Sequence, residues 1–136
     1  LRVIREWISD AALVALLRRC GTNLCPSSAE GWGHTIVEAM SVGSLVVTTD
    51  IAPMNEHVNE RRGLLVPVKH VEPMHAGIRA VVEIEALRAT IERAISLSDQ
   101  EWEARRQSAR RWFVDNDVRF RERMKSALTP FMVPGA

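Results

Sequence analysis

Two glutamates eight positions apart, Glu30 and Glu38, enclose a glycine-containing turn and the expected start of a helix. Glycine tolerates positive φ angles and lets the main chain approach a ligand closely. The first amides of a helix have no partner within it and carry a positive partial charge, which suits a phosphate group. We therefore expect phosphate to be bound by main-chain amides of this turn, those of Gly31, Gly33, His34 and Thr35.

Both carboxylates flank this expected phosphate site. A carboxylate accepts hydrogen bonds, and the hydroxyl groups of sugars donate them. A nucleotide sugar would meet both requirements, because it carries a sugar and a ribose on either side of its phosphates. The simpler alternative is that Thr35 and Glu38 form a capping box that starts the helix and that Glu30 is a surface residue. The spacing of the residues does not choose between these two interpretations.

Short apolar strands alternate with helices around this turn. The sequence predicts strands over residues 22–25, 45–49 and 64–66 and helices over 11–20, 35–42 and 54–59. Such an alternation indicates an α/β fold whose parallel sheet is covered by helices on both faces. The loops after Cys25, Thr49 and Val66 would then share the carboxyl edge of the sheet, where ligands bind in open α/β folds.

The second half of the chain has a weaker pattern at first and a helical pattern later. Residues 68–83 give no clear period, because Pro73 and Gly77 interrupt it. The sequence then predicts helices over residues 86–97, from a cap at Ser98 to about Asp115, and over 118–128.

Basic residues gather on the last two expected helices: Arg105, Arg106, Arg110, Arg111, Arg119, Arg121, Arg123 and Lys125. Acidic residues alternate with them, as is typical of a solvated helix face with pairs of opposite charge. We interpret them in this way and expect no nucleic acid as a partner. A module that binds nucleic acid or a membrane surface is the less favoured alternative.

The composition is that of one folded domain over residues 1–136. The chain of 136 residues is 46% hydrophobic and 26% charged, and its net charge of +1 disfavours strong attraction to polyanions. Cys20 and Cys25 have neither a redox spacing nor a disulfide framework, which indicates a reducing, cytoplasmic compartment. We find no apolar run long enough for a membrane span. The four histidines are scattered, so we expect no metal and no other cofactor.

Several segments together resemble the donor-binding half of the retaining GT-B glycosyltransferases, in the group similar to glycogen synthases and mannosyltransferases. They are residues 26–33, Glu38-Ala39-Met40, Gly43, Val46-Val47, Asn55-Glu56 and 63–66. The family's motif is a pair of glutamates separated by seven residues, which corresponds to Glu30 and Glu38. The resemblance implies a Rossmann-like parallel sheet flanked by helices, as the C-terminal half of a GT-B architecture, with extra C-terminal helices.

The resemblance also implies roles for single residues. Glu30 would contact hydroxyls of the donor sugar and is the candidate catalytic residue, while Glu38 would hold the ribose. Main-chain amides would contact the sugar and the diphosphate, those of Gly31, Trp32, Gly33, His34 and Thr35. Glu56 matches a glutamate that the family often carries, although a helix-starting carboxylate is the favoured interpretation. The implied reaction transfers a sugar from a nucleotide-diphosphate donor, with retention and without a metal.

Family members pair this half with an N-terminal acceptor domain and supply an Arg and a Lys from strands that would precede Leu1. We therefore expect the chain to be the donor-binding part of a longer enzyme, inactive or nearly so by itself. Peripheral association of that enzyme with a membrane stays open. The alternatives are a nucleotide-sugar epimerase or a non-catalytic binding domain of the same architecture.

Overall fold

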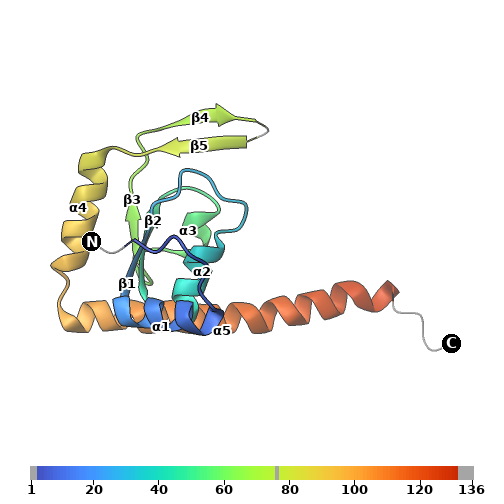
Figure 1. The fold of residues 1–136 in the computed structure, drawn as a ribbon. Helices are drawn as coiled ribbons and strands as arrows, with labels where there is room; N and C mark the ends of the chain where they lie inside the picture. The colour runs from blue at the N-terminus through green and yellow to red at the C-terminus, as the bar shows by residue number, and fades with distance from the viewer. Residues whose placement is uncertain (1–2, 76, 132–136) are drawn as a thin grey trace.

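The structure is a computed structural model that describes residues 3–75 and 77–131 (Figure 1). Its centre is a three-stranded parallel sheet made of β1 (Thr22–Cys25), β2 (Leu45–Thr49) and β3 (Leu64–Val66), in the order β1-β2-β3. These are the three strands that the apolar runs predict. The expected α/β fold with a parallel sheet flanked by helices is therefore confirmed.

Helices cover both faces of this sheet. On one face lie α2 (His34–Ser41), α3 (Met54–His57) and the first half of α5 (Asp99–Leu128). On the other face lies α4 (Ile84–Ile95), against Val47, Leu64 and Val66. Among the described residues, the remaining α-helix, α1 (Asp10–Cys20), precedes β1 and contacts it, and a short 3-10 helix, η1 (Thr129–Phe131), follows α5.

The central strand β2 is buried along its whole length. Val46 packs with Ile36 and Met40 of α2 and with Ala109 of α5, and Val47 packs on the opposite face. Strand residues alternate between the two faces, so one apolar run supplies both halves of the core. This packing fixes the sheet to α2, and therefore to the first turn of that helix.

The helices begin and end partly where the sequence predicts. Ser9 caps α1, and Ser98 and Glu101 form the expected capping box of α5. By contrast, the capping box expected at Thr35 and Glu38 is wrong. The helix α2 begins at His34, and its N-cap is Gly33 with φ of 88° and no side-chain cap.

The two expected C-terminal helices form a single helix, α5, of 30 residues. Asn116 and Asp117 have low helix propensity, which favoured a break there, but no proline or glycine stops the helix. In Figure 1 its second half extends beyond the sheet.

Residues 70–81, which gave no clear pattern, form an antiparallel hairpin. Its strands are β4 (His70–Met74) and β5 (Gly77–Val81). Pro73 lies inside β4, opposite Ile78 of β5, where a two-stranded sheet leaves an outer edge that tolerates a missing N–H. A proline inside a strand is uncommon, which is why the sequence did not indicate the hairpin.

Candidate functional site

The carboxyl edge of the parallel sheet carries the segment that contains Glu30 and the glycines. This segment, residues 26–33, leads from β1 into α2 and is called the donor loop below, after the role that the sequence resemblance implies for it. Two buried threonines of β2 hold its start: Thr48 Oγ1 donates to the Cys25 carbonyl at 2.8 Å, and Thr49 Oγ1 donates to the Ser27 carbonyl at 2.7 Å. The sheet thus fixes where the donor loop leaves it.

Glu30 is half-buried in the donor loop. Ser27 Oγ donates a hydrogen bond of 2.7 Å to Glu30 Oε1. A carboxylate has about four lone-pair sites on its two oxygens. Glu30 is therefore oriented by the chain and still able to accept hydrogen bonds from a ligand.

Thr35 and Glu30 both affect the pKa of the Cys25 thiol at the end of β1. Burial raises the pKa of the Cys25 thiol, a hydrogen bond with Thr35 opposes the rise, and the negative charge of Glu30 adds to it. The thiol therefore stays protonated near neutral pH. The side chains of Glu30 and Thr35 therefore both lie near the Cys25 thiol at the end of β1.

The first turn of α2 presents unpaired amides. The carbonyl of Gly33 accepts from the amides of Ile36 and Val37, both at 3.1 Å. Within the described part of the chain, the amides of His34 and Thr35 donate to no main-chain carbonyl. Two free donors at the positive end of a helix can bind an anion. The binding of phosphate at this turn stays a prediction.

A buried histidine forms a hydrogen bond with the main chain just before this turn. His57 of α3 is 2% exposed, and its Nε2 lies 2.6 Å from the carbonyl oxygen of Trp32. A carbonyl oxygen only accepts, so the ring donates Nε2–H to it. The imidazole also packs edge-on against Trp32, with ring centroids 4.4 Å apart, and against Trp112 of α5 at 5.4 Å.

The C-terminal end of α3 is tied to the same stack. Arg62 Nη2 donates to the Glu56 carbonyl at 2.9 Å, and Arg62 Nε donates to the His57 carbonyl. The guanidinium lies 5.1 Å from the centre of the Trp112 ring, within the range of a cation–π contact. Four side chains from four segments of the chain, those of Trp32, His57, Trp112 and Arg62, therefore pack as one unit.

Sequence reasoning missed His57, because its partner is a main-chain carbonyl 25 residues away. In the sequence, His57 is one of three polar residues between the apolar Met54 and Val58, and this pattern also fits a surface position. The lack of a side chain at Gly33 leaves room for Ile36 and His57 beside the turn. A Cβ at this position would lie 3.3 Å from Ile36 Cδ1 and 3.7 Å from His57 Cδ2.

The remaining expected site residues lie on the surface. Glu38 is exposed on α2, and so are His34 and Thr35 at its beginning. Gly31 is exposed, and a Cβ there would meet nothing within 4 Å, so its freedom is not needed for packing. Trp32 is half-exposed, because one part of its ring packs on His57 and the rest faces solvent. Glu56 is exposed on α3.

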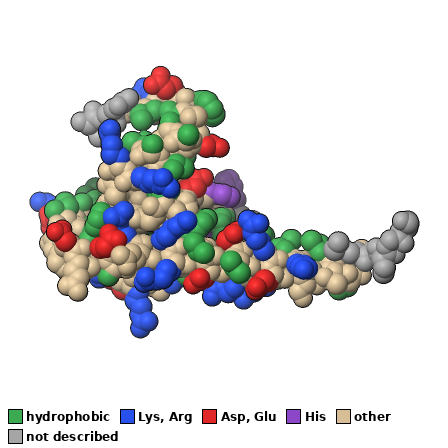
Figure 2. Space-filling view, turned by 90° about the horizontal axis from the view of Figure 1, so that it is seen from below, with side chains coloured by type: hydrophobic (Ala, Val, Ile, Leu, Met, Phe, Trp, Pro, Cys, Tyr) green, Lys and Arg blue, Asp and Glu red, His purple; other side chains and the backbone are tan. Residues whose placement is uncertain are grey.

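The arginines of α5 are partly engaged with the protein itself. Arg106 Nε donates to the Gly43 carbonyl and Arg110 Nη1 to the Ser41 carbonyl, so both satisfy carbonyls near the end of α2. Arg121 pairs with Asp117 at 2.9 Å. Figure 2 shows basic and acidic side chains interspersed along the face that it presents. These contacts agree with a solvated, structural role, and the expectation that nucleic acid is not a partner stays a prediction.

In residues 3–75 and 77–131, no three His, Cys, Asp or Glu side chains are grouped so that they could hold a metal ion. Across the same ranges, no helix is both long and apolar enough to cross a membrane.

Comparison with known proteins identifies one family. The sequence model of the family described as glycosyl transferases group 1 matches residues 5–96. The match covers well over half of the chain and includes the donor loop, α2, α3 and the hairpin. No curated protein matches the chain.

The contact between His57 and Trp32 can be tested by unfolding. His57→Leu places an apolar side chain of similar size in the core but leaves the Trp32 carbonyl without its donor. We expect a loss of about 1–3 kcal/mol in the free energy of unfolding, measured with urea. His34→Leu, at an exposed position, is the control and should change stability by less than about 0.5 kcal/mol. Equal stabilities of the two variants would contradict the role given to His57.

The proximity of Cys25 and Glu30 can be tested by alkylation of the thiol in a Cys20→Ser background. Glu30→Gln removes a negative charge that raises the pKa of Cys25, so that pKa should fall. The thiolate fraction at a given pH then rises, and the pH–rate profile of alkylation moves to lower pH. Glu38→Gln serves as the control and should leave the profile in place. If Glu30→Gln leaves the pH–rate profile unchanged, Glu30 does not lie close enough to Cys25 to raise the pKa of its thiol.

Proposed function

Because the chain belongs to the group 1 glycosyltransferases, we propose that its donor loop and the first turn of α2 bind a nucleotide-diphosphate sugar. The observation that carries the proposal is the pair of free amides at His34 and Thr35, beside the oriented carboxylate of Glu30. The amides suit the diphosphate, and the carboxylate suits the hydroxyls of a sugar. The family match supports glycosyl transfer as the chemistry that these groups serve.

Each expected residue then has a role. Glu30, held by Ser27, accepts hydrogen bonds from hydroxyls of the donor sugar and is the candidate catalytic residue. Glu38, exposed on α2, accepts hydrogen bonds from the ribose. The diphosphate contacts the main chain from Gly31 to Thr35. Trp32 supplies its amide, while its ring packs on His57 and holds the loop in shape.

The proposed reaction proceeds with retention of configuration at the anomeric carbon. The bond between that carbon and the diphosphate oxygen breaks, and a bond to the acceptor oxygen forms. The acceptor hydroxyl loses its proton to the departing diphosphate. The amides at the start of α2 stabilise the negative charge that develops on the leaving group, which is electrostatic catalysis. The two glutamates position the donor, and we expect no metal to be needed.

Transfer also requires an acceptor held against the donor and the exclusion of water. Gly31, His34 and Glu38 are open to solvent in this domain, so a further part must close over them. We infer that an acceptor domain outside residues 1–136 completes the active site, and that residues 1–136 form the donor-binding domain. By itself this domain should bind its donor and turn it over little or not at all.

Donor binding can be measured by calorimetric titration of the chain with UDP-glucose, GDP-mannose and ADP-glucose. We expect one of these three nucleotide sugars to bind. Glu38→Ala should weaken its binding about tenfold to a hundredfold, since hydrogen bonds to a charged group contribute about 1.5–3 kcal/mol. Glu122→Ala, an exposed glutamate near the end of α5, is the matched control and should not change the affinity.

Two outcomes would contradict the proposal. One is the absence of binding by a wild-type chain that circular dichroism reports as folded. The other is an unchanged affinity in Glu38→Ala. Conversion of the bound donor without any acceptor would favour an epimerase of the same architecture over a transferase.

A further inference from the structure

The hairpin β4–β5 is docked onto the donor loop. The amide of Ala80 in β5 donates a hydrogen bond of 2.7 Å to the carbonyl of Ser28 in that loop, and Ala80 is buried. In Figure 1 the hairpin lies beyond the carboxyl edge of the parallel sheet, on the side where the loop emerges. Segments separated by some 50 residues of chain therefore share one main-chain contact beside Glu30.

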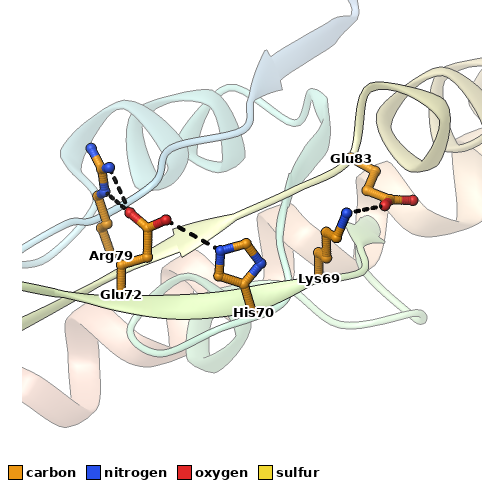
Figure 3. Close-up of polar contacts among 5 residues, drawn as sticks. All are labelled: Lys69, His70, Glu72, Arg79 and Glu83. Atoms are coloured by element: carbon orange, nitrogen blue, oxygen red, sulfur yellow. Dashed lines mark hydrogen bonds and ion pairs between the residues drawn. The ribbon is translucent and has the colours of Figure 1, made fainter.

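Polar contacts fix the shape of the hairpin (Figure 3). Glu72 of β4 accepts from Arg79, which lies directly opposite on β5, with Arg79 Nε at 2.8 Å, and it also contacts His70 at 3.2 Å. At the base, Lys69 pairs with Glu83 at 2.7 Å. Each pair contributes little by itself at the surface, but together they favour one register of the two strands. The hairpin is thus a formed element with a defined position.

A pocket lies between the tip of the hairpin and the donor loop. Its volume is about 440 Å³, and it is lined by Ala29, Glu30 and Gly31 on the loop side. On the hairpin side it is lined by Met74, His75, Gly77 and Ile78. This volume falls in the range of small-ligand sites, about 300–1,000 Å³. Met74 and Ile78 are 37% and 54% exposed, so no other described part of the chain covers these apolar side chains fully.

The two walls differ in chemistry. The loop wall offers a carboxylate and main-chain polar groups, and the hairpin wall offers a thioether, a branched aliphatic side chain and the imidazole of His75. A sugar ring has hydroxyl groups on its rim and apolar C–H groups on its faces. The pocket therefore matches a sugar: the carboxylate and the imidazole can bind its hydroxyl groups, and the aliphatic side chains can contact its C–H groups.

We propose that the hairpin β4–β5 is the second wall of the donor-sugar subsite. Glu30 accepts hydrogen bonds from the sugar's hydroxyls, and Met74 and Ile78 contact its C–H groups. This inference rests on the proposed function, which assigns the diphosphate to the start of α2 and the ribose to Glu38. The hairpin then determines how tightly the sugar is bound and does not affect the nucleotide.

The test compares a nucleotide sugar with its free nucleoside diphosphate, for example UDP-glucose with UDP. Ile78→Ser removes the apolar wall at an exposed position and should weaken the nucleotide sugar about fivefold to tenfold, while the free nucleotide binds as before. Met74→Ser should act in the same direction. Val71→Ser, at a 48% exposed position of β4 that does not line the pocket, is the matched control and should change neither affinity.

The outcomes separate this inference from the function on which it rests. A wild-type chain that binds neither ligand would overturn both. If the nucleotide sugar binds and Glu38→Ala weakens it, but Ile78→Ser and Met74→Ser do not, only the role of the hairpin is overturned. An equal loss for UDP and UDP-glucose would also overturn it, because the hairpin would then act on the nucleotide or on the fold.

Discussion

The hydrogen bond from buried His57 to the carbonyl of Trp32 is the contact on which the site depends most. It holds the peptide before Gly33, whose positive φ lets the chain turn into α2 with the amides of His34 and Thr35 unpaired. A partly buried carbonyl without a donor is costly, so the turn and the core favour each other. Trp112 also packs against the imidazole, which couples the C-terminal helix to the same turn.

The sheet and the hairpin complete the position of the donor loop. Thr48 and Thr49 hold its beginning through their hydroxyls, and Ala80 of β5 holds Ser28 through a main-chain hydrogen bond. The loop is thus fixed at three points by elements from different parts of the chain. Fixed dipoles and carboxylates bind a ligand more tightly than mobile ones, because less freedom is lost on binding. The same arrangement leaves the side of Glu30 and Gly31 open toward the pocket below the hairpin.

Local patterns predicted much of this structure. Continuous apolar runs identified the three parallel strands, and the edge at which they end located the loop that carries Glu30. The patterns failed where long-range contacts decide. The start of α2 is set by Gly33 and His57 and not by a Thr35 cap, the hairpin is hidden by Pro73, and the role of His57 depends on a carbonyl that no sequence motif marks. The helix α5 continues through Asn116 and Asp117 because low propensity alone does not end a helix.

The central claim is that phosphate binds to main-chain amides at the start of α2. The most direct measurement is a set of ¹⁵N–¹H spectra of the chain as a nucleoside diphosphate is added. We expect the largest shifts at the amides of Gly33, His34 and Thr35, which would gain hydrogen bonds to the phosphates. Shifts confined to the basic groove between α2 and α5, at Arg106 and Arg110, would contradict it and assign the phosphates to arginine side chains.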